Sequence, residues 1–155
     1  MSFEFPSLWT QLDRALGGIQ YVDGALGDKL YVLSVPLPEG STLETVPKAF
    51  FGDAIFNAQG TIVKGGTGID EYKVTSSKLI DAPENAVSTT RRRLALKYTT
   101  VTGNQLLVER RALVDAYEVA GTAYMIMLSA TATKWEASEK VRCERVADSF
   151  FIGQV

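Results

Sequence analysis

The chain has 155 residues, 46% of them hydrophobic and 22% charged, which is typical of one soluble globular domain spanning residues 1–155. No apolar run approaches the ~20 residues that a membrane-spanning helix needs, so we expect no transmembrane segment. The absence of histidine and the single cysteine, Cys143, exclude His-dependent nucleophiles, a Cys/His zinc site and an internal disulfide.

The formal net charge of -2 hides an asymmetry between the two parts of the chain. Residues 1–90 hold six Lys or Arg against eleven Asp or Glu, whereas residues 91–155 hold ten against seven, so the parts carry -5 and +3. A protein whose main partner is nucleic acid is normally basic overall. We therefore expect no nucleic-acid partner and favour an acidic protein surface.

The first part of the chain predicts strands around a short ambiguous segment. Alternating residues lead into Pro6, which confines them to a strand end, and Trp9 is expected to fold back as a lid on the core. Residues 10–16 form either two helical turns or a loop. Residues 19–23 predict a short strand, and the continuous apolar run of residues 30–37 predicts an inner strand buried on both faces.

A helix is predicted over residues 42–56. Ser41 and Glu44 have the spacing of a capping box, and Pro47 is expected to distort the first turns rather than to break the helix. The glycine-rich residues 57–70 match no phosphate-binding spacing, so they predict a mobile connection. A strand over residues 71–80 and a loop over residues 81–90 follow.

The next segment predicts a hairpin, because residues 94–98 alternate and Gly103-Asn104 is a turn signal before a second strand over residues 106–117. A turn centred between residues 103 and 104 sets three pairs opposite each other: Leu94 with Leu113, Arg92 with Asp115, and Lys97 with Arg110. The last pair brings like charges together, which is unfavourable unless an anion lies there.

The C-terminal part predicts a central strand and one amphipathic helix. Residues 123–130 are apolar on both alternating faces, so Met125 and Met127 are expected in the core. Thr133 and Glu136 have capping-box spacing at the start of a helix that runs to Phe150. One arc of this helix collects the residues expected to face the sheet: Trp135, Cys143, Val146, Ala147 and Phe150.

With these elements in order, several motifs resemble the PsbP family of extrinsic thylakoid-lumen proteins. The motifs are Phe3-x-Phe5-Pro6-x-x-Trp9, Gly121-Thr122-Ala123-Tyr124, and Ser129-Ala130-x-x-x-x-Trp135 followed by a helix ending in Asp148-Ser149-Phe150. The resemblance implies an α+β fold, an α/β/α sandwich around a central antiparallel β-sheet of the PsbP/Mog1-like kind. A histidine that the family carries near Arg111 is missing, so no metal site is transferred.

The resemblance also implies a function. It suggests a non-catalytic protein, peripheral to the membrane in the chloroplast thylakoid lumen and monomeric when free, that stabilises or helps assemble a photosynthetic complex. The oxygen-evolving side of photosystem II is the first candidate; photosystem I, photosystem II repair and the NDH-type complex remain alternatives. The first six residues carry no targeting signal, so import would require that a segment has been removed.

Two other classes of function stay open. One is an enzyme or ion-binding module that uses carboxylates and a hard cation, which needs at least three convergent Asp or Glu. The other is a Mog1-like adaptor that binds a small GTPase. We predict no cofactor, although the resemblance leaves weak Ca²⁺ binding open. Because the chain has no histidine, we also predict that its stability is nearly flat from about pH 8 to about pH 6.

The candidate partner-binding residues are the cations of the predicted hairpin: Arg91, Arg92, Arg93, Lys97, Arg110 and Arg111. If they share one face, an acidic partner would relieve their repulsion and would bind in a salt-dependent way. The alternative is a solvated sheet edge on which Arg92 pairs with Asp115.

Overall fold

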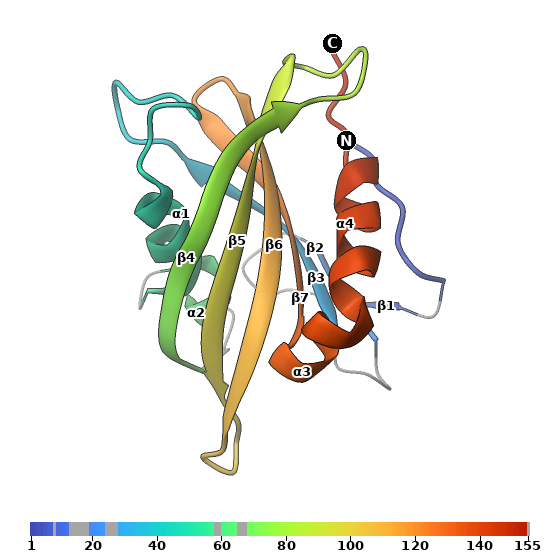
Figure 1. The fold of residues 1–155 in the computed structure, drawn as a ribbon. Coiled ribbons are helices and arrows are strands. Elements are labelled where there is room, and N and C mark those ends of the chain that lie inside the picture. The colour runs from blue at the N-terminus through green and yellow to red at the C-terminus, as the bar shows by residue number, and fades with distance from the viewer. Residues whose placement is uncertain (8, 13–18, 24–27, 58–59, 65–67, 155) are drawn as a thin grey trace.

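In the computed structural model of the protein, the described strands form one antiparallel sheet in the order β1-β2-β3-β7-β6-β5-β4 (Figure 1). The structure describes residues 1–7, 9–12, 19–23, 28–57, 60–64 and 68–154. The strands are β1 (Thr10–Leu12), β2 (Ile19–Val22), β3 (Lys29–Pro36), β4 (Gly68–Asp81), β5 (Thr90–Val101), β6 (Leu107–Val119) and β7 (Thr122–Thr131). The helices are α1 (Lys48–Phe56), α2 (Thr61–Lys64), α3 (Ala132–Lys134), the π-helix η1 (Trp135–Glu139) and α4 (Lys140–Ser149).

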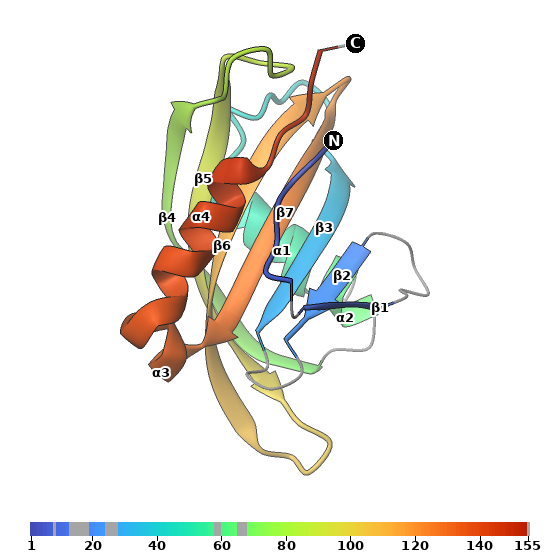
Figure 2. The same ribbon diagram turned by 90° about the vertical axis from the view of Figure 1, so that its right-hand side faces the viewer.

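The sheet lies between two helical layers, with α1 and α2 on one face and the continuous α3-η1-α4 segment on the other (Figures 1 and 2). Each layer has its own apolar core. Phe51 and Ile55 of α1 belong to the first core, and Trp135 and Cys143 belong to the second. The predicted α/β/α sandwich around an antiparallel sheet is therefore confirmed, and none of the described helices is long and apolar enough to span a membrane.

Strand β7 occupies the centre of the sheet, between β3 and β6. Met125 and Met127 are fully buried in the first core, whereas Ile126 and Leu128 are fully buried in the second. Both faces of β7 are covered, which explains why its sequence lacks an apolar-polar alternation. The predictions of a central strand and of core methionines are confirmed.

The β5–β6 hairpin forms as predicted, but its register differs by one residue. Its loop consists of residues 103–105, since Thr102 and Leu106 face each other and the Thr102 amide donates to the Leu106 carbonyl at 2.9 Å. Gln105 adopts φ 63°, the left-handed residue that closes three-residue hairpin loops. The extra loop residue sets new pairs opposite each other: Leu94 with Val114, Arg92 with Ala116, Arg93 with Asp115 and Lys97 with Arg111.

The first helix begins six residues later than predicted. Pro47 is the N-cap of α1, and the Ser41/Glu44 capping box does not form; instead the Thr42 amide donates to Thr45 Oγ1 at 2.9 Å. Proline has no N–H and clashes with the carbonyl four residues before it, so it cannot continue a helix begun at residue 42. The predicted glycine-rich connection contains the short helix α2, and residues 58–59 and 65–67 lie outside the described residues.

The C-terminal helix has a different start from the predicted one. It begins at Ala132 with no side-chain cap, so the Thr133/Glu136 capping box is wrong, and its second segment is the π-helix η1. The predicted buried arc is nevertheless confirmed, because all five of its residues are buried. Trp9 is also buried, as predicted for a lid.

The N-terminal segment runs beside the end of α4 (Figure 2). Ser2 forms a β-bridge with Phe151, and the Glu4 amide donates to Ser149 Oγ at 2.8 Å. Thr10–Leu12 is strand β1, so these residues extend the sheet and do not form the helical turns or the loop that were the two expectations. Residues 13–16 of that segment lie outside the described residues.

Candidate partner-binding face

The six predicted cations do not form one exposed surface, which corrects that part of the prediction. Arg91, Arg92 and Arg110 are 5%, 8% and 5% exposed. Successive residues of a strand point to opposite faces of a sheet, so Arg91 and Arg93 lie under α4 whereas Arg92 points toward α1. Four of the six arginines and lysines are consequently engaged inside the protein, as the following contacts show.

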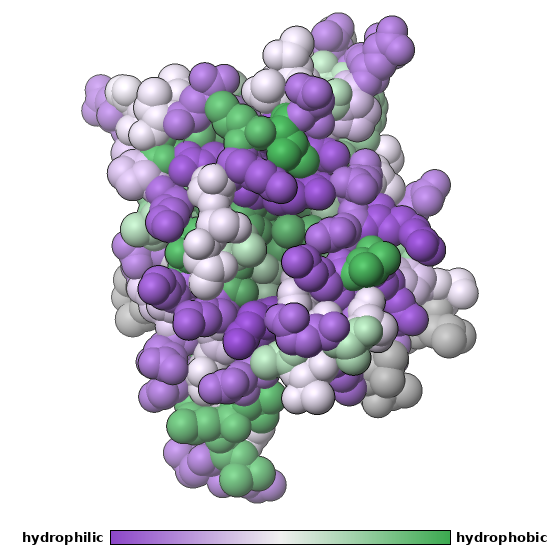
Figure 3. Space-filling view, in the orientation of Figure 1, coloured by the Kyte–Doolittle hydropathy of each residue, from purple (hydrophilic) through white to green (hydrophobic). Residues whose placement is uncertain are grey.

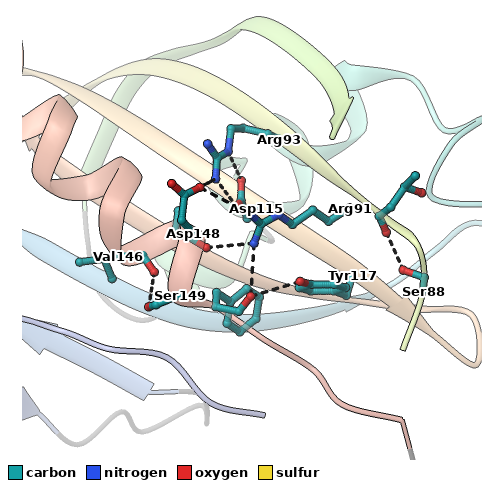
Figure 4. Close-up of polar contacts among 11 residues, drawn as sticks. Ser88, Arg91, Arg93, Asp115, Tyr117, Val146, Asp148 and Ser149 are labelled. Carbon is teal, nitrogen blue, oxygen red and sulfur yellow. Dashed lines mark hydrogen bonds and ion pairs between the residues drawn. The ribbon is translucent and has the colours of Figure 1, made fainter. Parts of the chain in front are cut away.

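Arg91 holds the C-terminal end of α4 (Figure 4). Its Nη1 donates to the carbonyl oxygens of Ala147 at 3.2 Å and Phe150 at 3.3 Å. The last carbonyls of a helix have no partner within the helix and carry partial negative charge. A buried guanidinium from β5 donates to two carbonyl groups at this helix end and fixes α4 on the sheet.

Arg93 forms the strongest ion pair of this cluster (Figure 4). Its Nε and Nη2 donate to the two carboxylate oxygens of Asp115 at 2.7 and 2.8 Å, and Nη2 also donates to Asp148 at 2.7 Å. The hydrogen bond to Asp115 is the main cause that raises the pKa of Arg93. The Asp115 side chain is completely buried, so this pair is shielded from water and salt.

Arg92 and Arg110 work on the opposite face. Arg92 donates to the Leu43 carbonyl at 2.8 Å and to the Val46 carbonyl, and thereby anchors the segment that precedes α1. Arg110 donates to Ser129 Oγ at 2.9 Å. Both arginines hold elements of the fold together, and neither is available to a partner. The predicted alternative, an ion pair between Arg92 and Asp115, does not form, because Asp115 pairs with Arg93.

Two predicted cations remain accessible, and the structure adds a third. Lys73 of β4 lies opposite Lys97 of β5, which lies opposite Arg111 of β6. Lys73 and Lys97 are exposed and Arg111 is half-buried. We call these three residues the cation row. The row crosses three adjacent strands on the sheet face that carries α4. Helix α4 itself packs farther along the sheet, on β6 and β7 (Figure 1).

An acidic row lies one step along the same strands. Glu71 of β4 and Glu109 of β6 flank Thr99 of β5. The two rows line a shallow cavity of about 340 Å³. Figure 3 shows that this side of the molecule is largely hydrophilic. The lower end, formed by the β5–β6 hairpin, carries apolar side chains beside hydrophilic ones, and Leu106 and Leu107 are 63% and 61% exposed there.

The three residues of the cation row lie directly opposite one another on neighbouring strands. Like charges directly opposite each other on neighbouring strands are destabilising. Among the described residues, no ion pair joins Lys73 or Lys97 to a carboxylate. The predicted pair of Lys97 with Arg110 is wrong, because the register differs by one residue and places Arg111 opposite Lys97. An anionic group placed over the row would relieve this repulsion.

A second polar site, which the sequence did not predict, lies at the η1 end of the helical layer, whereas the cluster of Arg91, Arg93 and Asp115 lies at the C-terminal end of α4. Asp28, immediately before β3, is completely buried, and Glu139 of η1 is 4% exposed. Burial, followed by the adjacent carboxyl of Glu139, raises the pKa of Asp28 to about 7. The raised pKa of Asp28 argues against the predicted flat stability between pH 8 and pH 6. On a helical wheel Glu139 falls between Trp135 and Cys143, and that position was the available signal.

Cys143 is fully buried beside this acidic pair, and burial raises the pKa of its thiol. A buried protonated thiol packs as a small apolar group and is a poor nucleophile. Among the residues that the structure describes, no group of three His, Cys, Asp or Glu gathers closely enough to hold a metal ion.

The strand order and the two helical layers define a PsbP/Mog1-like fold. The solution structure of cyanobacterial PsbP from Synechocystis sp. PCC 6803 matches with a TM-score of 0.61 and 17% identity, over 97% of this chain and 85% of that one. The Saccharomyces cerevisiae Ran-binding protein Mog1p matches with a TM-score of 0.55 and 14% identity, over 95% and 80%. No family model and no curated protein matches the sequence. At these identities the likeness establishes the fold alone.

Proposed function

We propose that this protein is a non-catalytic binding protein of the thylakoid lumen that docks on a photosynthetic membrane complex, with the oxygen-evolving side of photosystem II as the first candidate. The fold likeness to cyanobacterial PsbP over 97% of the chain supports this proposal. The motifs that resemble the PsbP family lie on structural landmarks: Trp9 is the lid, and Trp135 anchors η1.

The docking site proposed here is the cation row, and the observation that carries it is the placement of Lys73, Lys97 and Arg111 directly opposite one another on three neighbouring strands. An acidic loop of the partner would neutralise the row and gain both affinity and a faster encounter. The flanking carboxylates of Glu71 and Glu109 would reject a uniformly acidic surface and would select a narrow segment aligned with the row.

A charge-reversal experiment tests the docking site. The variant Lys73→Glu/Lys97→Glu changes two exposed side chains, so it should fold normally. Its matched control, Lys48→Glu/Lys140→Glu, changes the net charge equally at exposed positions of α1 and α4. Binding to thylakoid membranes and to isolated photosystem II, photosystem I and NDH-type complexes is measured across a salt series.

We expect the wild type and the control to bind one complex and to dissociate as salt rises, whereas the row variant binds weakly even at low salt. Equal binding of the row variant and the control would reject the cation row as the docking site. Binding of the wild type to none of the complexes would reject the photosynthetic role itself.

A second candidate is an adaptor for a small GTPase, and the likeness to the Ran-binding protein Mog1p favours it. Titration calorimetry of the wild-type protein with Ran, in its GDP and GTP forms, distinguishes the two. Saturable binding to Ran without binding to any photosynthetic complex would establish the adaptor and displace the first proposal.

A further inference from the structure

Asp28 and Glu139 come from distant parts of the chain to the same end of the sheet. Asp28 directly precedes Lys29, which lies opposite Ser129 near the end of β7. Strand β7 ends at Thr131, and the chain then turns into α3 and η1. The last residue of η1, Glu139, is turned inward and faces the start of β3.

Three of the four carboxylate oxygens of this pair lack, within the described part of the chain, the hydrogen bonds that burial requires. Among the residues that the structure describes, neither Oδ1 nor Oδ2 of Asp28 has a hydrogen-bond donor, and neither does Oε2 of Glu139. An ionised carboxylate without donors is very costly to bury, because nothing replaces its hydration. Two carboxylates are acceptors only, so neither can satisfy the other. A single added proton would turn one of them into a donor.

We propose that Asp28 and Glu139 form a buried proton-binding site, in which one proton carried by Asp28 joins the two side chains in a hydrogen bond. The proton belongs on Asp28 because Glu139 has other support for its charge. Glu139 accepts a hydrogen bond from Ser138 Oγ at 3.2 Å, and Nη1 of Arg142 lies 3.4 Å from its Oε2.

Charged and titratable groups from each surrounding element act on this site. They are Asp23 after β2, Lys134 of α3, Glu139 of η1, and Arg142 and Cys143 of α4. Asp23 favours the protonated form of Asp28 and Lys134 opposes it, but burial and Glu139 outweigh Lys134, so the pKa of Asp28 is about 7. Near neutral pH the site is partly occupied by a proton.

Loss of the proton places two adjacent negative charges beneath η1. Their repulsion acts between the start of β3 and the π-helix, so deprotonation should loosen the packing of η1 on the sheet. Arg142 would move with η1 and α4, and Arg142 and Asp23 also line an open groove of about 410 Å³ beside the N-terminal segment. The site thereby links the pH of the solution to the shape of that groove.

Infrared difference spectroscopy of the full chain, titrated from about pH 5 to about pH 9, observes the carbonyl band of a protonated carboxyl directly. We expect a band that disappears near neutral pH in the wild type and that is absent from Asp28→Asn. Glu139→Gln supplies an amide donor to Asp28, so its band should disappear at least one pH unit lower. The control Glu136→Gln alters an exposed carboxyl of the same π-helix and should match the wild type.

Circular dichroism establishes that each variant folds before its spectrum is compared. Persistence of the neutral-pH band in Asp28→Asn would overturn the assignment to Asp28. A wild-type spectrum without a band that titrates near neutral pH would overturn the site itself. Loss of the wild-type band on addition of Ca²⁺ at pH 6 would show that the carboxyls bind a cation, and would replace the proton site with a cation site.

Discussion

Arg93 and Asp115 lie directly opposite each other on β5 and β6 and are joined by two hydrogen bonds of 2.7 and 2.8 Å. The same carboxylate lies 3.6 Å from Nε of Arg91. One buried acid therefore neutralises two arginines that hold α4 on the sheet. This arrangement explains why an acidic protein concentrates arginines in a strand that lies beneath a helix.

Replacement of Asp115 should be severely destabilising. Asp115→Ala leaves the guanidinium groups of Arg91 and Arg93 without their shared buried counter-ion, which costs about 3 to 5 kcal/mol. Asp148 also pairs with both arginines, but its side chain is 61% exposed, so Asp148→Ala should cost less than about 1 kcal/mol. Urea unfolding of both variants measures the difference, and similar losses would show that α4 is held mainly by other contacts.

Trp135→Ala should remove the largest anchor between η1 and the sheet. Trp135 is 6% exposed and belongs to the second apolar core, so its loss should cost roughly 3 to 5 kcal/mol. The neighbouring Glu136 is exposed, and Glu136→Ala should stay within about 0.5 kcal/mol of the wild type. A denaturation midpoint for Trp135→Ala that equals the wild-type midpoint would contradict this prediction.

Stability should rise as pH falls from 8 to 6. The pKa of Asp28 is raised from 3.8 to about 7 in the folded protein, so the folded state holds a proton there that the unfolded state has released. This contribution is fully present below the unfolded pKa and is lost as pH rises through about 7. Linkage gives a change of about 1 kcal/mol between pH 8 and pH 6.

Urea unfolding at several pH values checks this slope. Asp28→Asn cannot titrate at this position, so its free energy of unfolding should be flat over the same range. An equal slope in the wild type and in Asp28→Asn would assign the pH dependence to another group.

A suitable substitution of Ala120, in the turn between β6 and β7, should increase the stability of the protein. Ala120 and Gly121 form its two-residue loop with φ values of 50° and 78°, and alanine is unfavourable in this left-handed region. Ala120→Asn should stabilise the protein by up to about 1 kcal/mol, whereas the β-branched Ala120→Val should destabilise it. Thermal unfolding of the two variants should shift the midpoint in opposite directions.

The elements of the fold could be predicted because their signals are local. The apolar run of β7 and the buried arc that contains Trp135 and Cys143 follow from periodicity within one segment. The hairpin register could not be fixed in this way, since one additional loop residue, Gln105, changes every pair. The start of α1 differs from the predicted one because Pro47 cannot continue a helix begun at residue 42, and the capping-box spacing of Ser41 and Glu44 does not reflect that constraint.

The candidate site was harder to predict because its residues depend on which face of which strand they occupy. Six cations in two strands suggested one basic face. Because successive residues of a strand point to opposite faces, Arg91 contacts the end of α4 and Arg92 contacts the segment before α1. Lys73 joins the cation row only through the pairing of β4 with β5, a long-range contact. Asp28 carries no local signal of burial, since its environment is supplied by η1.

The β-bridge between Ser2 and Phe151 places the two end segments of the described chain side by side, close to where N and C are marked in Figure 1. A short glycine-serine linker could therefore join the ends without distorting the sheet, and new ends could be opened in the exposed loop at residues 103–105. Such a circular permutant would separate β5 from β6 in sequence while keeping every strand pair. It would turn a local contact of the sheet into the most distant one, and its refolding rate would report how much the order of folding depends on that hairpin.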